Sequence, residues 1–146
     1  MQLSGDIKIT QALPFLAASA SADRNGAILD MQGYEGVLML VQMADIAAGA
    51  TISIKAQQDT DPAGGTMADL AGTGIAVADD DDDQIFWLDI KPTERYVRVV
   101  VDKDAANNTN ECAIYFQYGP SARPVDNNVA DLVTGEVHNY PAEGAA

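Results

Sequence analysis

The chain has 146 residues, 47% of them hydrophobic, which excludes wholesale disorder and suits one domain with its own core. Its 22 acidic and 8 basic residues give a net charge of −14, which disfavours binding to nucleic acids or to anionic membranes. The single cysteine, Cys112, excludes an internal disulfide. No basic region followed by an apolar stretch opens the sequence, so we expect no signal peptide and synthesis in a cytoplasm.

The first predicted strands are short and weakly patterned, over residues 6–10 and 26–30. Between them, residues 11–20 are apolar but contain Pro14, which cannot donate a hydrogen bond to a sheet ladder. This segment is therefore expected to form an irregular or edge strand. Its large apolar side chains, Leu13 and Phe15, are candidates for contact with a neighbouring subunit.

Two stronger strand patterns follow, and they differ in kind. Residues 36–43 are apolar almost throughout, which predicts a strand covered on both faces. In residues 51–57 the apolar Ile52, Ile54 and Ala56 alternate with polar residues, which predicts a half-buried strand.

The second half of the chain continues the pattern of short strands. A weak strand is predicted at 75–78, and β-branched or aromatic strands at 85–90, 95–101 and 112–118. Turn-forming segments separate them, and no helical segment of 10–15 residues intervenes. The sequence therefore predicts an all-β fold, an antiparallel β-sandwich of jelly-roll-like or immunoglobulin-like type, over residues 1–120.

Residues 121–146 have scattered apolar residues and no period, which is typical of an extended arm. Val125, Leu132, Val133 and Tyr140 could attach this arm to a neighbouring subunit. The alternative is a tail that wraps its own domain or frays.

Catalytic patterns are not found. His138 is the only histidine, no nucleophile-elbow motif is present, and the glycines at 64–65 and 72–74 lack the lysine and helix of a phosphate-binding loop. We therefore predict no catalytic residue, no cofactor and no enzyme activity.

The most conspicuous local feature is a run of five aspartates, which is expected to form a solvated loop before the strand at 85–90. Its oxygen atoms also suit Ca²⁺, although the spacing matches no EF-hand loop. A calcium site is thus a weaker alternative for the five members of the run: Asp79, Asp80, Asp81, Asp82 and Asp83.

Two arginines and the single tryptophan have more than one interpretation. Arg95 and Arg98 could form salt bridges between subunits, or pair with acidic residues of their own chain. Trp87 follows Phe86 in a strand, so one of the two is expected to face the core. Packing is the first interpretation of Trp87, and stacking on a sugar is the second.

A resemblance to a known family rests on three segments and two closing motifs: Asp30–Gly36, Gly49–Asp61, Lys91–Val101, Tyr118-Gly119-Pro120 and Pro141–Ala145. Together they resemble the capsid decoration (cement) proteins of tailed bacteriophages. The resemblance covers roughly residues 26–146. It implies a β-sandwich made in the host cytoplasm that binds the outer surface of an assembled capsid. The implied partners are the major capsid protein and further copies of the chain, often as a homotrimer, with no nucleic acid and no membrane.

Alternative functions remain open on the sequence alone. Another β-protein of the virion, of the tail tube or associated with a fibre, would have the same composition. A carbohydrate-binding surface module is a third class, and it would require an exposed aromatic platform at Trp87.

Overall fold

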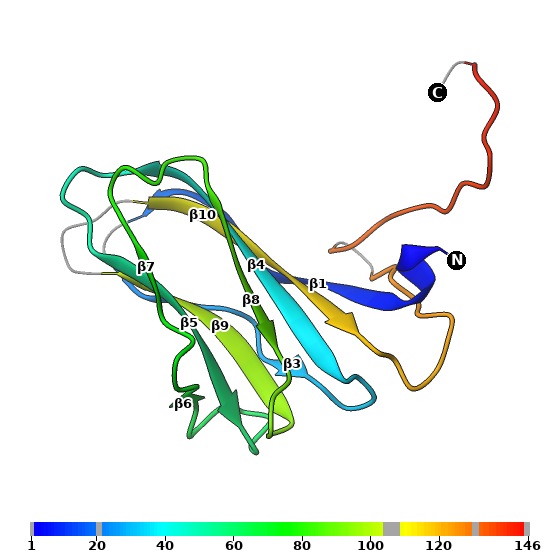
Figure 1. Ribbon diagram of the computed structural model, residues 1–146, viewed down its shortest axis with the longest axis horizontal. Coiled ribbons are helices and arrows are strands. Elements are labelled where there is room, and N and C mark those ends of the chain that lie inside the picture. The colour runs from blue at the N-terminus through cyan, green and yellow to red at the C-terminus, as the bar shows by residue number, and fades with distance from the viewer. Residues whose placement is uncertain (1, 20–21, 104–108, 130–131, 145–146) are drawn as a thin grey trace.

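The computed structural model describes residues 2–19, 22–103, 109–129 and 132–144, and it consists of two antiparallel sheets packed face to face (Figure 1). The first sheet has the order β1 (Ile7–Ser19), β10 (Thr109–Tyr118), β4 (Gly36–Ile46) and β8 (Ile85–Ile90). The second has the order β2 (Arg24–Asn25), β9 (Tyr96–Lys103), β5 (Ile52–Asp59) and β6 (Ala68–Asp69). In this second sheet β3 (Leu29–Asp30) also pairs with β9, and β7 (Ile75–Val77) also pairs with β5. The predicted antiparallel β-sandwich is confirmed.

The local patterns explain most of these strands. In β5, Ile52, Ile54 and Ala56 point into the core, as their alternation predicts. Strand β8 has the predicted bounds, whereas of residues 26–30 only Leu29–Asp30 form a strand. A short 3-10 helix, η1 (Leu3–Gly5), precedes the first strand.

Strand β1 confirms the irregular or edge strand expected at residues 11–20, as far as residue 19, and corrects the prediction for Leu13. It is one long edge strand paired only with β10, and its register shifts between Gln11 and Leu13. The irregularity turns both Ala12 and Leu13 inward, and each is only 4% exposed. Leu13 lies opposite the buried Ala113 of β10. The prediction that Leu13 contacts a neighbouring subunit was therefore wrong, because the bulge makes it a core residue.

Tyr115 of β10 joins the two sheets across the core. Its hydroxyl donates a hydrogen bond to the carbonyl oxygen of Ala27 (3.0 Å) and accepts one from the amide of Val99 in β9 (2.8 Å). Burial raises the pKa of this phenol far above its usual range. Gly26 is required beside it, since a Cβ at that position would collide with the Tyr115 hydroxyl.

A wholly buried ion pair forms a second link between the sheets. Lys103 Nζ of β9 lies 2.6 Å from Glu111 Oε1 of β10, and neither side chain is exposed. Arg24 of β2 reaches the same carboxylate oxygen at 3.0 Å, and the Thr109 hydroxyl donates to its other oxygen at 2.5 Å. All charged groups of this cluster therefore have partners, as burial of charge requires.

Candidate interaction surface

The outer face of the four-stranded sheet is largely apolar, with Gln11, Gln42 and Asp89 as polar members of its rows. In β10 the side chains of Glu111, Ala113 and Tyr115 are buried, so the intervening ones point outward. The same alternation exposes one side of β4 and β8. The outward apolar side chains, called the apolar face below, are Ile9, Leu38, Leu40, Ile85, Trp87, Ile114 and Phe116.

Strand register places these side chains in continuous rows across the sheet. Leu40 of β4 lies between Ile114 of β10 and Trp87 of β8. In the next row Phe116 lies between Ile9 and Leu38. Direct cross-strand neighbours have Cβ atoms roughly 5 Å apart, so each row is a contact surface rather than a set of isolated residues.

Exposure is greatest along the β8 edge of this surface. Trp87 is 61% exposed and Ile85 is 59% exposed, while Ile114 in the middle of the sheet is 39% exposed. Phe86, between Ile85 and Trp87, packs against the core. The expectation that one of these two aromatic residues faces the core is confirmed, with Phe86 in that role and Trp87 on the outer side of the sheet.

The apolar face corrects the prediction for residues 36–43. A run that is apolar on both faces predicts a strand covered on both sides, yet the sandwich covers only one. Val37, Met39 and Val41 are in the core, whereas Leu38 and Leu40 point away from it. The sequence thus carries apolar residues for a second covering layer that the single chain does not provide among its described residues.

Tyr118 and Asp89 form the polar border of this surface. The Tyr118 hydroxyl of β10 donates a 2.7 Å hydrogen bond to Asp89 Oδ1 of β8, passing over Gly36 of the intervening β4. A Cβ on Gly36 would overlap the Tyr118 ring. Burial, and then the hydrogen bond to Asp89, raise the pKa of Tyr118 to about 12. The phenol therefore stays neutral and holds these strands together.

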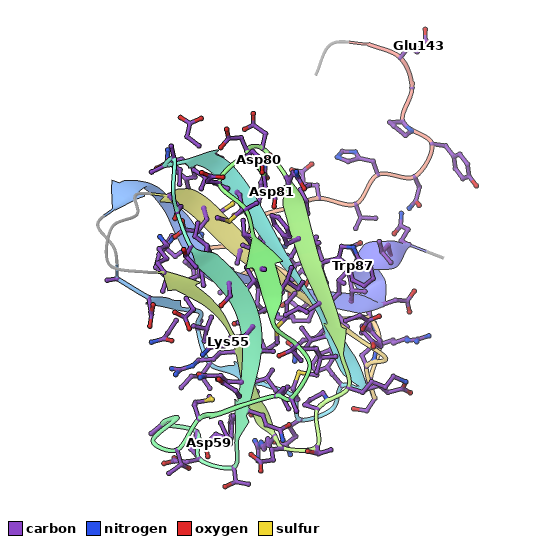
Figure 2. All side chains as sticks on the ribbon, turned by 60° about the vertical axis from the view of Figure 1, so that its left-hand side comes forward. Lys55, Asp59, Asp80, Asp81, Trp87 and Glu143 are labelled. Atoms are coloured by element: carbon purple, nitrogen blue, oxygen red, sulfur yellow. The ribbon has the colours of Figure 1, made fainter. Side chains whose placement is uncertain are left out.

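The outer face of the second sheet is polar, so the two sides of the sandwich differ. Lys55 of β5 lies 3.0 Å from Asp69 Oδ2 and 3.2 Å from Asp102 Oδ2. The hydrogen bond to Asp69, followed by that to Asp102, raises the pKa of the Lys55 ammonium. Figure 2 shows Lys55 and Trp87 on opposite sides of the molecule. One outer side is hydrated and ionic, and the other is apolar.

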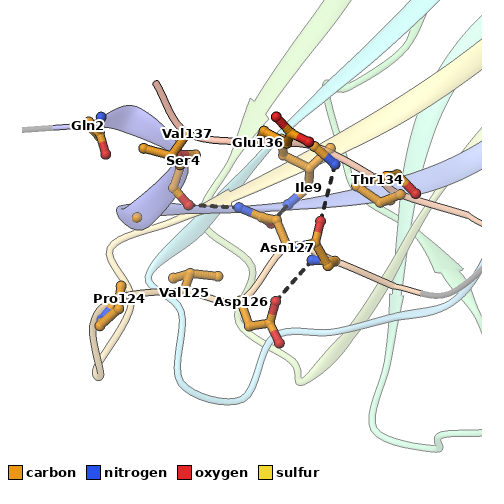
Figure 3. Close-up of a pocket in the computed structure, with 14 residues that line it drawn as sticks. Gln2, Ser4, Ile9, Pro124, Val125, Asp126, Asn127, Thr134, Glu136 and Val137 are labelled. Carbon is orange, nitrogen blue, oxygen red and sulfur yellow. Dashed lines mark hydrogen bonds between the residues drawn. The ribbon is translucent and has the colours of Figure 1, made fainter. Parts of the chain in front are cut away.

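The base of the C-terminal arm is attached at the β1 edge of the apolar face (Figure 3). The Asn127 side chain accepts a 2.7 Å hydrogen bond from the Ile9 amide and donates to the carbonyl oxygens of Ile7 (2.8 Å) and Ser4 (2.7 Å). It thereby satisfies backbone groups on the open edge of β1, as a neighbouring strand would. The Val125 amide donates to the Gly5 carbonyl oxygen at 3.0 Å, which fixes the same segment to η1.

A groove of about 380 Å³ lies between the arm, η1 and β1. Its apolar lining includes Ile9, Val125, Val133 and Val137. Val129 and Val133 form a turn by exchanging backbone hydrogen bonds of 2.9 Å. Beyond it the chain extends away from the sandwich (Figure 1), and Tyr140 is fully exposed.

The structure brings together only some of the residues predicted to form an interface. Val125 and Val133 line the groove, and Leu132 and Phe15 are exposed, at 61% and 63%.

Arg95 and Arg98 lie on β9 or beside it, in the other sheet, and both bond within the chain. Arg95 forms two hydrogen bonds with the Asp30 carboxylate, at 2.8 and 2.7 Å, and Arg98 Nε donates to Gln57 Oε1 at 2.8 Å. The intersubunit salt bridges therefore stay a prediction, and each arginine already has an internal partner.

Sequence reasoning did not identify the apolar face. Its signal was present, because residues 36–43 and 112–118 carry apolar side chains at both odd and even positions. Only the strand register shows that the outward apolar side chains of the four strands lie beside one another. Cys112 also points toward this side and is half-buried, as an unpaired thiol.

The aspartate run forms turns that join β7 and β8 to the end of β4. Asp79 Oδ2 accepts a hydrogen bond from the Gly49 amide (2.6 Å), Asp81 Oδ2 from the Ala78 amide (2.8 Å) and Asp82 Oδ1 from the Ile46 amide (2.8 Å). The carboxylates thus point to different backbone groups. Across the described residues, no three His, Cys, Asp or Glu side chains form a group that could hold a metal ion.

His138 lies in the exposed part of the arm. Its Nε2 is 3.2 Å from Glu136 Oε2, and both side chains are more than 60% exposed. In the part of the chain that the structure describes, no helix is long and apolar enough to cross a membrane.

Comparisons with known proteins give a distant structural likeness. No protein-family profile and no curated protein matches the chain. A solved structure described as "Bacillus endospore appendages form a novel family of disulfide-linked pili" is similar over 83% of this chain and 96% of that chain. The two are 17% identical, with a TM-score of 0.45. A likeness this distant has no bearing on function.

Proposed function

We propose that this chain is a structural virion subunit that binds the outer surface of an assembled phage capsid and braces neighbouring capsomers. The observation that carries the proposal is the apolar face, a set of aligned outward apolar side chains on a chain of net charge −14. Contiguous exposed apolar patches of this kind mark surfaces that bind other proteins. The charge keeps the free subunit soluble until it reaches its partner.

The resemblance to decoration proteins adds the location. A subunit that coats a shell needs one side for the shell or its neighbours and another for solvent. The apolar face and the polar outer face around Lys55 supply these two sides. Many identical contacts on one shell also act together, so each contact can be weak.

A sedimentation experiment with matched variants tests the proposal. Purified protein is mixed with heads of the encoding phage assembled without this chain, and the heads are pelleted. We expect the wild type to co-sediment and Ile114→Glu, which places a charge in the middle of the apolar face, to stay in the supernatant. Leu3→Glu is the control, since Leu3 is 65% exposed but lies on η1. Failure of the wild type to pellet would refute capsid binding.

A carbohydrate-binding module is the second candidate, because Trp87 is 61% exposed as a sugar platform requires. Its row neighbour Leu40 and its strand neighbour Ile85 are apolar, however. Asp89, two residues along β8, already accepts a hydrogen bond from Tyr118, which leaves Gln42, opposite Ile85, as a polar side chain near Trp87. Quenching of Trp87 fluorescence by added glycans, but not by chemically similar polyols, would favour this candidate.

A further inference from the structure

We propose that the C-terminal arm of one copy, residues 132–144, covers the apolar face of a second copy, so that the chain associates with itself by exchanging arms. The inference deepens the proposed function by naming the occupant of this face, and it rests on the premise that the chain is an assembly subunit. Arm exchange of this kind between identical copies closes readily into a small symmetric oligomer.

The first argument is that the arm is held at its base and leaves much apolar surface exposed beyond it. Asn127 fixes the base through two hydrogen bonds to β1 and one to η1. Farther along, the arm keeps one side-chain contact with the N-terminal segment, a hydrogen bond from Gln2 to Asn139. Farther on, Leu132, Val137 and Tyr140 are 61%, 54% and 100% exposed. An extended segment with this much free apolar surface gains by burying it against another apolar surface.

The second argument is direction. The base of the arm lies at the β1 edge, beside Ile9 at the margin of its own apolar face. From there the chain runs past η1 and away from the sandwich instead of back across the sheet (Figure 1). A neighbouring copy, rather than the copy's own face, therefore lies in the path of Tyr140.

The third argument is reach. The apolar face is four strands wide, and strands are spaced about 4.8 Å apart, which gives a width of roughly 15 Å. Residues 134–144 number eleven, and an extended chain rises about 3.3 Å per residue, so this segment spans roughly 36 Å. The segment is long enough to cross the whole face of a second copy.

The fourth argument is charge. Two copies of a chain with a net charge of −14 repel each other at most orientations. The members of the apolar face carry no charge, and the nearest carboxylate of the strands, Asp89, is held by the Tyr118 hydroxyl. Contact between the apolar side chains of the arm and the apolar face pairs uncharged groups, and Glu136 and Glu143 are the only carboxylates of the described part of the arm beyond residue 131.

The test combines mass and fluorescence on the full chain, without capsids. Trp87 is the only tryptophan and lies on the proposed contact surface, so its emission reports directly on coverage. We expect sedimentation to give a multiple of the 15.4 kDa chain mass, with Trp87 shielded from acrylamide. The double variant Val137→Asp/Tyr140→Asp is expected to give the monomer mass and a severalfold increase in quenching. Leu3→Asp, an exposed apolar residue outside both surfaces, is expected to behave like the wild type.

Mixing two defective variants gives an independent test. One variant carries Val137→Asp/Tyr140→Asp and keeps an intact face, and the other carries Ile114→Glu and keeps an intact arm. Each should be a monomer alone, and the mixture should form a 1:1 pair in which Trp87 is shielded only in the copy with the intact face.

Three results would overturn the arm exchange. They are a wild-type monomer, an oligomer that persists with both arm residues changed, and a mixture that does not pair. A monomer that still co-sediments with heads would refute only this inference, whereas an arm-exchanged oligomer that fails to bind heads would refute only the capsid proposal.

Discussion

Lys103 and Glu111 form an ion pair of 2.6 Å with no exposed side-chain surface, and it links β9 of one sheet to β10 of the other. Removal of Lys103 leaves the buried Glu111 carboxylate with only Arg24 and Thr109 as partners. The loss should therefore lie at the lower end of the about 3–5 kcal/mol that breaking a buried pair costs. We expect Lys103→Met to lower the free energy of unfolding by about 3 kcal/mol, and Lys103→Met/Glu111→Leu to recover much of that loss. Urea denaturation measures both.

The matched control is Lys55→Met. Lys55 also bonds to two carboxylates, but its side chain is 25% exposed and Asp69 is 53% exposed. Its loss should cost no more than about 1 kcal/mol. Equal effects of the two lysine substitutions would show that burial does not set the strength of the Lys103 pair.

The attachment of the arm gives a prediction that separates local from global stability. Asn127→Ala removes three hydrogen bonds to η1 and β1, each contributing about 0.5–1.5 kcal/mol net. We expect amide exchange in residues 121–129 to increase severalfold while strands β4, β5 and β10 stay protected. Asn128→Ala is the control, because Asn128 accepts only a hydrogen bond from the Gly135 amide within the arm. Unchanged exchange in the Asn127 variant would contradict the assigned anchor.

Stability should fall in acid partly through Asp59 at the end of β5. The hydrogen bond from the Asp61 amide, assisted by the amide and hydroxyl of Thr66, holds the pKa of the Asp59 carboxyl below its ordinary value. A lowered pKa stabilises the fold fully above the ordinary value of 3.8 and loses that effect as the pH falls through the folded-state pKa.

We therefore expect Asp59→Asn to be less stable than the wild type near neutral pH, and the difference to shrink as the pH falls below 3.8. Urea unfolding at a series of pH values measures it. The exposed Asp80 supplies the control substitution Asp80→Asn. A difference that stays constant with pH would count against a folded-state role of the Asp59 carboxylate.

Leu13 and Phe15 test the correction made at the β1 bulge. Leu13 is 4% exposed and Phe15 is 63% exposed, although they are two residues apart. We expect Leu13→Ala to lower the free energy of unfolding by about 2–5 kcal/mol, and Phe15→Ala to change it by no more than about 0.5 kcal/mol. Thermal or urea unfolding measures both. If Leu13→Ala had no larger effect than Phe15→Ala, the register of β1 would be wrong.

Sequence reasoning predicted the strands well where one local rule decides. Ile52 and Ile54 alternate with polar residues, so their strand and its buried side follow from side-chain period alone. The register of β1 could not be predicted from side-chain period. Nothing in the residues around Leu13 marks the shift that turns it inward, because that shift depends on pairing with Ala113, which lies a hundred positions away.

The candidate surface was predictable only in part for the same reason. The arm and its exposed Leu132 and Tyr140 follow from a sequence without period. Trp87 required knowledge that β8 is an edge strand beside Leu40, which is a property of topology. Lys103 and Glu111 look like ordinary surface charges in sequence, and only the packing of two sheets buries them together.

The measurement that tests the proposed function most directly is immunogold electron microscopy of particles of the encoding phage, with antibody against the recombinant protein. The capsid proposal predicts gold distributed over the heads, and loss of that label when the gene carries Ile114→Glu. Gold confined to the tails, or no gold on particles, would contradict it.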